Sequence, residues 1–373
     1  MGDPLRVLQI YPKADFFTGA AIQVRDLAAG LAARGHAVTV ATPPSTEWPA
    51  RCRAAGLQHV TIPMRRPYDV RAAWRLARVI RRGRIQVAHA HKGRARTLMV
   101  LAGFLGARGA RLVLNRGVSF PIGRVHRVGY TTARVHAIVA VCASIKRGLV
   151  AAGVPDDKIE VIYSGTDVAR FHPGVDGVAI RRELGLAPDA FLVTQIGVRS
   201  WRGWRDVLDA VQQVAPQCPR ARLLFVGAPP PRVAQLADEA RARGVGGRVL
   251  VLGHRDDVPA ILAASDLVVD ASYAGLGITG SVREALACER PVIATDLEGM
   301  PELITHGETG LLVPPRDPKA MADAMLRVIG DPALAHAMAR AGRARVEARF
   351  SLRAKIDATE ALYRRLVAGD RAP

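Results

Sequence analysis

The chain has 373 residues, 49% of them hydrophobic, and a formal net charge of +20. This length favours two domains over one core, and the hydrophobic content excludes a disordered chain. No run of eighteen apolar residues predicts a membrane-spanning helix, and the chain passes directly into a strand-like run, so no signal peptide is expected. The four cysteines are far apart and lack metal-ligand spacing, which suits a reducing compartment.

The positive charge is concentrated in the first half. Residues 1–165 hold 26 Lys and Arg against 8 Asp and Glu, whereas residues 166–373 hold 27 against 25. An anionic partner facing the first half would account for this asymmetry, and a nucleic acid, an anionic membrane or a phosphorylated acceptor would all serve. A genome-wide excess of arginine is the alternative, but it does not explain the balanced second half.

Strand-like runs alternate with helical patterns along the chain, which predicts βαβ units and parallel sheets. The predicted elements of the first half are strands at 6–10, 37–41, 85–91, 110–115, 136–141 and 159–162 and helices at 21–34 and 69–82. The helix over 69–82 has an apolar stripe and arginines at its other positions. Such a helix either lies on an anionic membrane or packs its stripe on the sheet.

Two places in the first half could contact a ligand. Gly19 lies in the loop between the first strand and the first helix, where a phosphate could approach, although many such loops need glycine only for the turn. His91 ends the strand 85–91, and a histidine at the carboxyl end of a strand is a candidate for contact with substrate. A zinc site at His89 and His91 is discounted because no further ligands cluster with them.

The segment 171–188 is polar, contains Pro and Gly, and is typical of a linker. The predicted elements beyond it are strands at 191–197, 221–226, 248–252, 267–269 and 291–294 and helices at 204–214, 256–264, 318–329, 332–348 and 352–367. Arg199 and Arg202 lie in the loop after the first of these strands. They could clamp a diphosphate, or they could be ordinary solvated loop residues.

A glycine-rich turn at 275–280 follows the strand 267–269 and opens into a helix. Its free N–H groups and the helix dipole predict an anion site suited to phosphate, with Glu284 in the first helical turn. The alternative is a capping box formed by Ser281 and Glu284. Further turns at 299–302 and 307–310 also follow strands, so all three should converge on the carboxyl edge of one sheet.

The sequence resembles the GT-B glycosyltransferases of family 4. The resemblance covers nearly the whole chain and is strongest at 283–287, 291–295, 301–304 and 310–313, with further matches at 30–38, 161–167 and 202–203. It implies an α/β fold of two facing Rossmann-like domains with a cleft between them. Residues 1–170 would form the acceptor domain, joined by a C-terminal helix at about 352–373, and residues 171–351 would form the donor domain.

The resemblance also implies roles for individual residues. Arg199 and Arg202 would hold the donor diphosphate, Glu284 the ribose, and His91 would lie near the transferred sugar. The remaining donor-binding positions implied are Gly19, Gly253, His254, Arg255, Thr279, Gly280 and Ser281. The chain departs from the family where Arg202 replaces the commoner lysine, Gly19-Ala20 replaces Gly-Gly, and Leu276 replaces the first of two glutamates. The last departure leaves the donor sugar open.

The expected function is retaining glycosyl transfer from a nucleotide-diphosphate sugar to an acceptor hydroxyl, in lipopolysaccharide, cell-envelope or other glycoconjugate synthesis. No Asp-x-Asp motif is present, so neither a metal nor another cofactor is expected. The expected partners are the nucleotide sugar and an anionic glycan or lipid-linked acceptor, and no nucleic acid. The expected location is cytoplasmic, with peripheral contact at the inner face of an anionic membrane as an option. A sugar-nucleotide epimerase and a non-enzymatic basic protein that binds membrane or nucleic acid are the alternatives.

Overall fold

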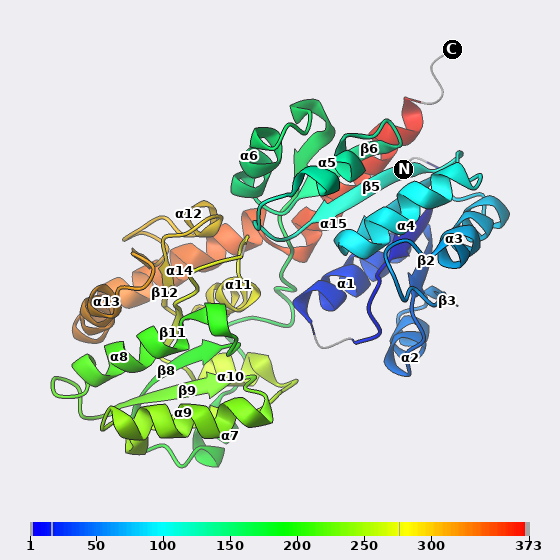
Figure 1. Ribbon diagram of the computed structural model, residues 1–373. Helices are drawn as coiled ribbons and strands as arrows, with labels where there is room; N and C mark the ends of the chain where they lie inside the picture. Colours follow the sequence, from blue (N-terminus) through cyan, green and yellow to red (C-terminus); the bar gives the residue numbers. More distant parts are fainter. Residues whose placement is uncertain (1–2, 16–17, 276, 370–373) are drawn as a thin grey trace. The chain divides into compact units, whose positions relative to one another are not determined.

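The structure is a computed structural model that describes residues 3–15, 18–275 and 277–369, with the side chains of 124 and 125 left out. The chain divides into two compact units, each built on one parallel sheet (Figure 1). The first unit comprises Met1–Gly165 and Leu352–Pro373, and the second comprises Thr166–Ser351. The two predicted Rossmann-like α/β domains are therefore confirmed.

The sheet of the first unit has the order β3-β2-β1-β4-β5-β6-β7. Its strands are β1 (Arg6–Ile10), β2 (Ala37–Thr42), β3 (Gln58–Thr61), β4 (Val87–His91), β5 (Arg111–Arg116), β6 (Val135–Ala140) and β7 (Ile159–Val161). Its helices are α1 (Gly19–Ala33), α2 (Glu47–Ala54), α3 (Val70–Arg82), α4 (Lys92–Phe104), α5 (Arg124–Thr131), α6 (Ala143–Ala151) and α15 (Leu352–Ala368). Strand β4 is buried along its whole length, as expected for a parallel strand covered on both faces.

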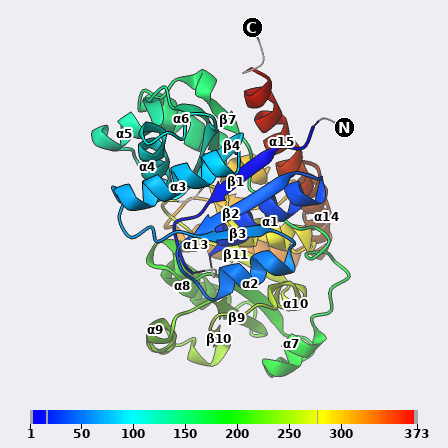
Figure 2. The ribbon, with the colours of Figure 1, turned by 90° about the vertical axis from the view of Figure 1, so that its right-hand side faces the viewer.

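The C-terminal helix α15 packs against α1 within the first unit (Figure 2). Close approach is possible because α1 carries Gly30, where a Cβ would lie 2.1 Å from Cδ1 of Ile356. Arg34, which follows α1, forms ion pairs with Asp357 and with Glu360, the latter at 2.8 Å. The end of the chain therefore belongs to the first unit, as the resemblance implied.

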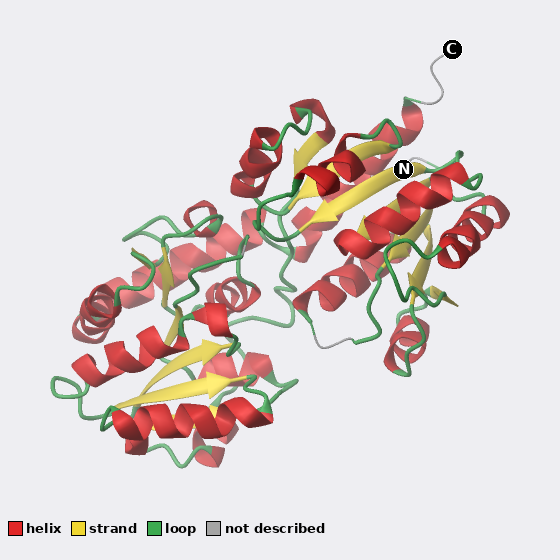
Figure 3. Cartoon of the chain, viewed as in Figure 1, coloured by secondary structure: helices red, strands yellow, loops and turns green. Residues whose placement is uncertain are grey.

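The sheet of the second unit, whose strands are yellow in Figure 3, has the order β10-β9-β8-β11-β12-β13. Its strands are β8 (Phe191–Ile196), β9 (Ala221–Val226), β10 (Val249–Leu252), β11 (Leu267–Asp270), β12 (Val292–Thr295) and β13 (Leu311–Val313). Its helices are α7 (Val178–Glu183), α8 (Trp204–Val214), α9 (Pro230–Ala242), α10 (Val258–Ala264), α11 (Gly280–Ala287), α12 (Met300–Leu303), α13 (Pro318–Gly330) and α14 (Pro332–Arg349).

Two features of the second unit differ from the simple sequence pattern. The segment 171–188, predicted as a linker, contains helix α7, in which Ile180 is buried in an apolar cluster with Leu192 and Ile261. The strand order reverses between β8 and β11, and the carboxyl ends of such a pair form the usual ligand position of an open parallel sheet.

No helix in the described part of the chain has the length and apolarity needed to cross a membrane.

Candidate functional site

The loops after β8 and β11 meet at the carboxyl edge of the second sheet. The two strands are neighbours, with Val193 opposite Leu267. Gly203, between the β8 loop and α8, has a φ of +59°, and a Cβ there would lie 2.0 Å from the carbonyl oxygen of Ala271. Only glycine fits this left-handed, crowded position. Residue 203 therefore brings the loop with the two arginines against the turn after β11.

The side chain of Arg202 is buried at this junction and is 8% exposed. Its Nη1 lies 2.8 Å from Oδ2 of Asp270, the last residue of β11. The guanidinium also donates to the hydroxyls of Ser272, Thr279 and Ser281, each at 3.2 Å, and to the carbonyl of Ile196 at 2.6 Å. The structure thus brings together three residues that the resemblance assigned to the donor: Arg202, Thr279 and Ser281.

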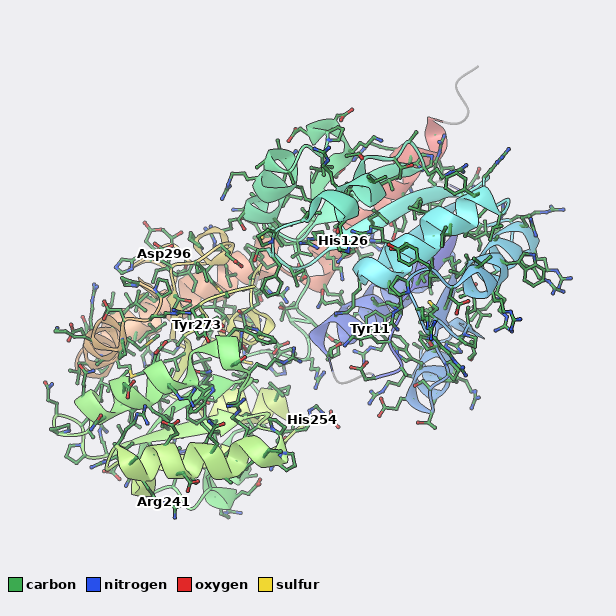
Figure 4. All side chains as sticks on the ribbon, in the orientation of Figure 1. Tyr11, His126, Arg241, His254, Tyr273 and Asp296 are labelled. Carbon is green, nitrogen blue, oxygen red and sulfur yellow. The ribbon has the colours of Figure 1, made fainter. Side chains whose placement is uncertain are left out.

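Arg199 has a different environment from Arg202. Its side chain is exposed, its guanidinium carbon lies 5.7 Å from the centre of the Trp201 ring, and it forms no ion pair with a described residue. Tyr273 fixes the loop between the two arginines, since its hydroxyl donates to the carbonyl of Ser200 at 2.8 Å and its N–H to that of Trp201 at 3.0 Å (Figure 4). One arginine of the predicted clamp is accessible, and the other is held inside.

Helix α11 begins at Gly280, with Thr279 as its N-cap residue and no side-chain cap. Two sequence expectations need correction here. The capping box does not form with Ser281 as N-cap, because Ser281 is already helical and its hydroxyl accepts from Arg202. Glu284 lies in the second turn rather than the first, because the helix starts earlier than Ser281. The first N–H groups of a helix lack intrahelical partners, so the anion-binding potential of this helix start stands.

Sequence reasoning did not select Asp270 or Arg283. Asp270 is 2% exposed at the end of an otherwise apolar strand, and an acid in such a run was a usable signal. Arg283 is buried at 4% exposure, and burial lowers its pKa to about 10. A Cβ at Gly280 would lie 3.6 Å from its Nη2, so this guanidinium is close to the start of α11. Nothing in the residue pattern distinguished Arg283 from a solvated helix residue.

The loop containing Gly253, His254 and Arg255 follows β10. Gly253 accepts a hydrogen bond from the N–H of Gly227 at 2.9 Å. Arg255 donates to both carboxylate oxygens of Glu183 in α7, at 2.5 and 3.0 Å, and to those of Asp257, at 2.8 and 2.5 Å. These carboxylates raise the pKa of Arg255. Arg255 therefore anchors the loop, while the His254 side chain is exposed (Figure 4).

In the first unit, His91 belongs to a buried polar chain. Its Nε2 donates to Oε1 of Gln9 at 2.7 Å, and its ring stacks on His89 with 4.3 Å between centroids. Nε2 of Gln9 donates to the hydroxyl of Tyr363 in α15 at 3.0 Å, and that hydroxyl donates to Nδ1 of His89 at 2.6 Å. Acceptance at Nδ1 requires a neutral His89, whereas the donor role of His91 fits either of its protonation states. Burial lowers the pKa of His89 to about 3 and that of His91 well below its usual range.

The backbone turns sharply directly after His91. Lys92 has a φ of +70°, a left-handed conformation uncommon for a residue with a side chain. Gly19 is the first residue of α1, and apart from its own backbone neighbours no atom of a described residue lies within 4 Å of where its Cβ would be. Thr18 before it caps the helix and bonds to the hydroxyl of Tyr11 at 2.8 Å. Leu276 lies outside the described residues.

Among the described residues, no three His, Cys, Asp or Glu side chains are grouped closely enough to hold a metal ion. At the junction of the β8 and β11 loops, the Arg202 guanidinium meets the Asp270 carboxylate, and the Arg283 guanidinium lies close to the start of α11. A helix start and guanidiniums at the carboxyl edge of a doubly wound sheet are suited to an anionic ligand.

Comparison with known proteins identifies the class more closely. The profile described as "Glycosyltransferase Family 4" matches residues 17–170, and the one described as "Glycosyl transferases group 1" matches residues 188–331. The chain is 32% identical over 248 residues to the lipopolysaccharide core biosynthesis mannosyltransferase LpsB of Rhizobium meliloti (strain 1021), a match over 64% of this chain and 69% of that protein. It is also 32% identical to the D-inositol 3-phosphate glycosyltransferase of Rhodococcus jostii (strain RHA1), over 50% of this chain but only 43% of that protein.

A solved structure gives the same assignment at the level of the fold. The chain superposes on Anabaena Alr3699/HepE, crystallised with UDP, with a TM-score of 0.85 and 21% identity, over 96% of this chain and 99% of that one. The GT-B architecture is thereby confirmed. The chain belongs to the family 4, or group 1, glycosyltransferases and is a glycosyltransferase.

Proposed function

We propose that this glycosyltransferase takes its sugar from a nucleotide-diphosphate sugar and retains the anomeric configuration. The observation that carries the proposal is buried Arg202, whose guanidinium contacts Thr279 and Ser281 at the start of α11, with exposed Arg199 in the same loop. Guanidiniums and helix N-termini are the groups that proteins use to bind phosphate. The complexes of Anabaena Alr3699/HepE with UDP and with UDP-glucose support a nucleotide donor of this kind.

In the proposed reaction the bond between the anomeric carbon and the diphosphate breaks, and the acceptor hydroxyl attacks from the same face. The hydroxyl proton passes to the leaving phosphate oxygen. Negative charge grows on that phosphate, and Arg199, Arg202 and the N–H groups at Gly280 and Ser281 would stabilise it, each by roughly 2–4 kcal/mol on the scale of other preorganised donors. With these cations present we propose that no metal takes part.

Other residues have proposed contacts with the donor. Glu284 would bind the ribose hydroxyls, and Thr279 would support the diphosphate. Gly253 and exposed His254 would border the base, with Arg255 holding their loop in place. In the first unit, His91 and Gly19 would lie near the transferred sugar. Because Nε2 of His91 is committed to Gln9, the neutral ring would offer the sugar its Nδ1 as a hydrogen-bond acceptor.

We propose that the acceptor is an anionic glycan or lipid-linked saccharide of the cell envelope, with lipopolysaccharide as one candidate. The work would take place at the cytoplasmic face of a membrane. The charge of the two units supports this proposal: the first holds 31 Lys and Arg against 11 Asp and Glu, and the second holds 22 against 22. The name of the Rhizobium meliloti relative points in the same direction.

Two substitutions test the donor site. Arg199→Ala and Glu284→Ala should each lower turnover by about 10²–10³-fold, since each removes a preorganised contact with the donor, while the melting temperature stays near that of the wild type. Arg220→Ala, an exposed arginine of the same unit, is the control. The assay is nucleotide release from the best donor of a nucleotide-sugar panel, and near-wild-type rates in both variants would remove the assignment.

The stereochemistry and the metal requirement can be tested with the same reaction. The coupling constant of the anomeric proton in the product should match that of the donor, and turnover should survive excess EDTA. Inversion of that configuration would contradict the retaining mechanism. Loss of activity in EDTA that a divalent cation restores would contradict the metal-free mechanism.

A further inference from the structure

Helix α3 presents an exposed face that combines arginines with large apolar side chains. We define the α3 surface as Arg65, Arg66, Tyr68, Val70, Arg71, Trp74, Arg75, Arg78 and Arg82. Tyr68 is 70% exposed, Val70 61% and Trp74 46%. The opposite face of the helix is buried through Ala72, Ala73, Leu76, Ala77 and Ile80. The packing of α3 is therefore satisfied on that side, and the α3 surface does not serve the described core of the first unit.

The arginines of the α3 surface lack acidic partners. None of them forms an ion pair with a described residue, and the one acid in the segment, Asp69, caps the helix by accepting from the N–H of Ala72 at 3.0 Å. In the second unit, by contrast, arginines face carboxylates: Arg243 pairs with Asp209 at 2.5 Å and Arg181 with Asp266 at 3.2 Å. An arginine-rich genome alone does not explain this difference, because the second unit balances its arginines.

The combination of arginines with large apolar side chains on the α3 surface favours a lipid membrane over other anionic partners. Arginines alone would suit any polyanion, but Trp74, Tyr68 and Val70 have apolar bodies that water solvates poorly. Trp and Tyr favour the interface between lipid headgroups and acyl chains, and arginines at the same depth attract anionic headgroups. The guanidinium of Arg78 lies 5.5 Å from the centre of the Trp74 ring, so cation and aromatic ring are presented together.

We propose that the α3 surface is a docking surface for an anionic phospholipid bilayer. The inference deepens the proposed function, since it names the surface that would hold the enzyme at a membrane carrying a lipid-linked acceptor. Docking itself needs neither donor nor acceptor. Basic residues at an anionic membrane each strengthen binding by about fivefold, so the arginines of this face together suffice for reversible attachment at physiological ionic strength.

The experiment is vesicle co-sedimentation of the full chain without substrates. Vesicles of phosphatidylcholine are compared with vesicles containing about one third phosphatidylglycerol, an anionic content at which surface potential governs peripheral binding. The test variant replaces Arg71, Arg75 and Arg78 with Gln. The matched control replaces Arg220, Arg241 and Arg353 with Gln, which removes the same charge from exposed positions elsewhere. A third variant, Trp74→Ala, removes the apolar contact.

The wild type should partition onto anionic vesicles at least tenfold more strongly than onto phosphatidylcholine. The α3 variant should lose about 100-fold, at roughly fivefold per arginine, and the control should stay within a few-fold of the wild type. Trp74→Ala should bind several-fold more weakly. Equal binding to both vesicle types, or equal losses in the α3 and control variants, would overturn the proposal. Stronger binding to duplex DNA than to anionic vesicles at physiological salt would also overturn it.

Stabilisation by UDP, measured as a thermal shift in the same preparations, separates this proposal from the proposed function. Because the α3 surface lies in the first unit and UDP is expected on the second, the α3 variant should keep the wild-type shift. Failure of docking with an intact UDP shift would count against the α3 surface alone. An absent UDP shift in a wild type that binds vesicles would count against the proposed donor site alone.

Discussion

At the scale of single residues, the two arginines of the donor site are prepared differently. Arg199 is exposed and forms no ion pair with a described carboxylate, whereas Arg202 is buried against Asp270 and three hydroxyls. A buried guanidinium needs a counter-charge, and Asp270 supplies it to Arg202. We propose that Asp270 is a positioning residue that keeps Arg202 directed at the start of α11.

The Asp270→Asn substitution tests this role. Because it removes a buried charge but keeps the shape, it should destabilise the ligand-free second unit by about 3–5 kcal/mol, as expected when one partner of a buried pair is lost. A bound nucleotide diphosphate would then become the counter-charge of Arg202, so the thermal shift produced by UDP should be larger than in the wild type. An unchanged shift with lowered stability would show that Arg202 does not meet the diphosphate.

From the sequence, the loop after β8 pointed to Arg202, and the family resemblance pointed to Thr279 and Ser281. The side chains of these residues are in contact, while their roles toward the donor stay predictions. Their contacts could not be foreseen, because the inward direction of Arg202 depends on Asp270 in a distant strand. For the same reason the burial of Arg283 could not be predicted from the sequence, because it depends on contacts that only the structure shows.

At the scale of elements, the proposed donor site depends on a tight junction between the loop after β8 and the turn after β11. The strand and helix periodicities predicted the loop after β8 and the turn after β11. They did not predict how closely this loop and this turn approach each other. That separation is set by Gly203, which has a left-handed backbone and the carbonyl of Ala271 beside its Cα. The helix start was harder to predict, since Ser281 and Glu284 matched a capping box that the structure does not form.

Gly203→Ala should be strongly destabilising. The left-handed backbone costs a residue with a Cβ about 1 kcal/mol or more, and relief of the contact with Ala271 requires a backbone shift, so a total near 3 kcal/mol is expected. Gly247→Ala, at a position with open space for the Cβ, is the matched control and should change stability by less than about 1 kcal/mol. Urea unfolding of both variants gives the comparison, and equal midpoints would contradict the junction.

At the scale of the whole molecule, a buried polar chain connects distant parts of the first unit. In the first unit the chain's end is tied to the sheet through Tyr363, which joins Gln9 of β1 and His89 of β4. Composition predicted two domains and the resemblance predicted the returning helix, but no periodicity reveals a buried polar chain that spans more than 270 residues of sequence. The charge of the molecule is likewise divided, with the entire excess on the first unit.

This polar chain predicts a pH dependence for the first unit. Its histidines are neutral when folded and take up protons below about pH 6.5 when unfolded, so its stability is complete above that pH and falls as the pH drops toward 3. Each histidine should contribute a loss of up to about 1.4 kcal/mol per pH unit in this window. Hydrogen exchange of β1 and β4 amides at pH 7.5 and pH 5 measures the loss.

The control for the pH dependence is a matched pair of histidine substitutions. His89→Gln should reduce the pH-dependent loss by about half, because one of the two depressed groups is gone. His254→Gln, at an exposed position of the second unit, should leave it unchanged. Identical pH slopes in the wild type and His89→Gln would contradict the account of the polar chain.

The central claim is that a nucleotide diphosphate binds at the start of α11 through the arginines of the β8 loop. Calorimetric titration of UDP, GDP and ADP into wild type and Arg199→Ala tests it most directly. The tightest of these ligands should lose at least about tenfold in affinity in Arg199→Ala, as expected for loss of a charge-assisted contact, while Arg220→Ala binds like the wild type. Equal dissociation constants in all three proteins would contradict the claim.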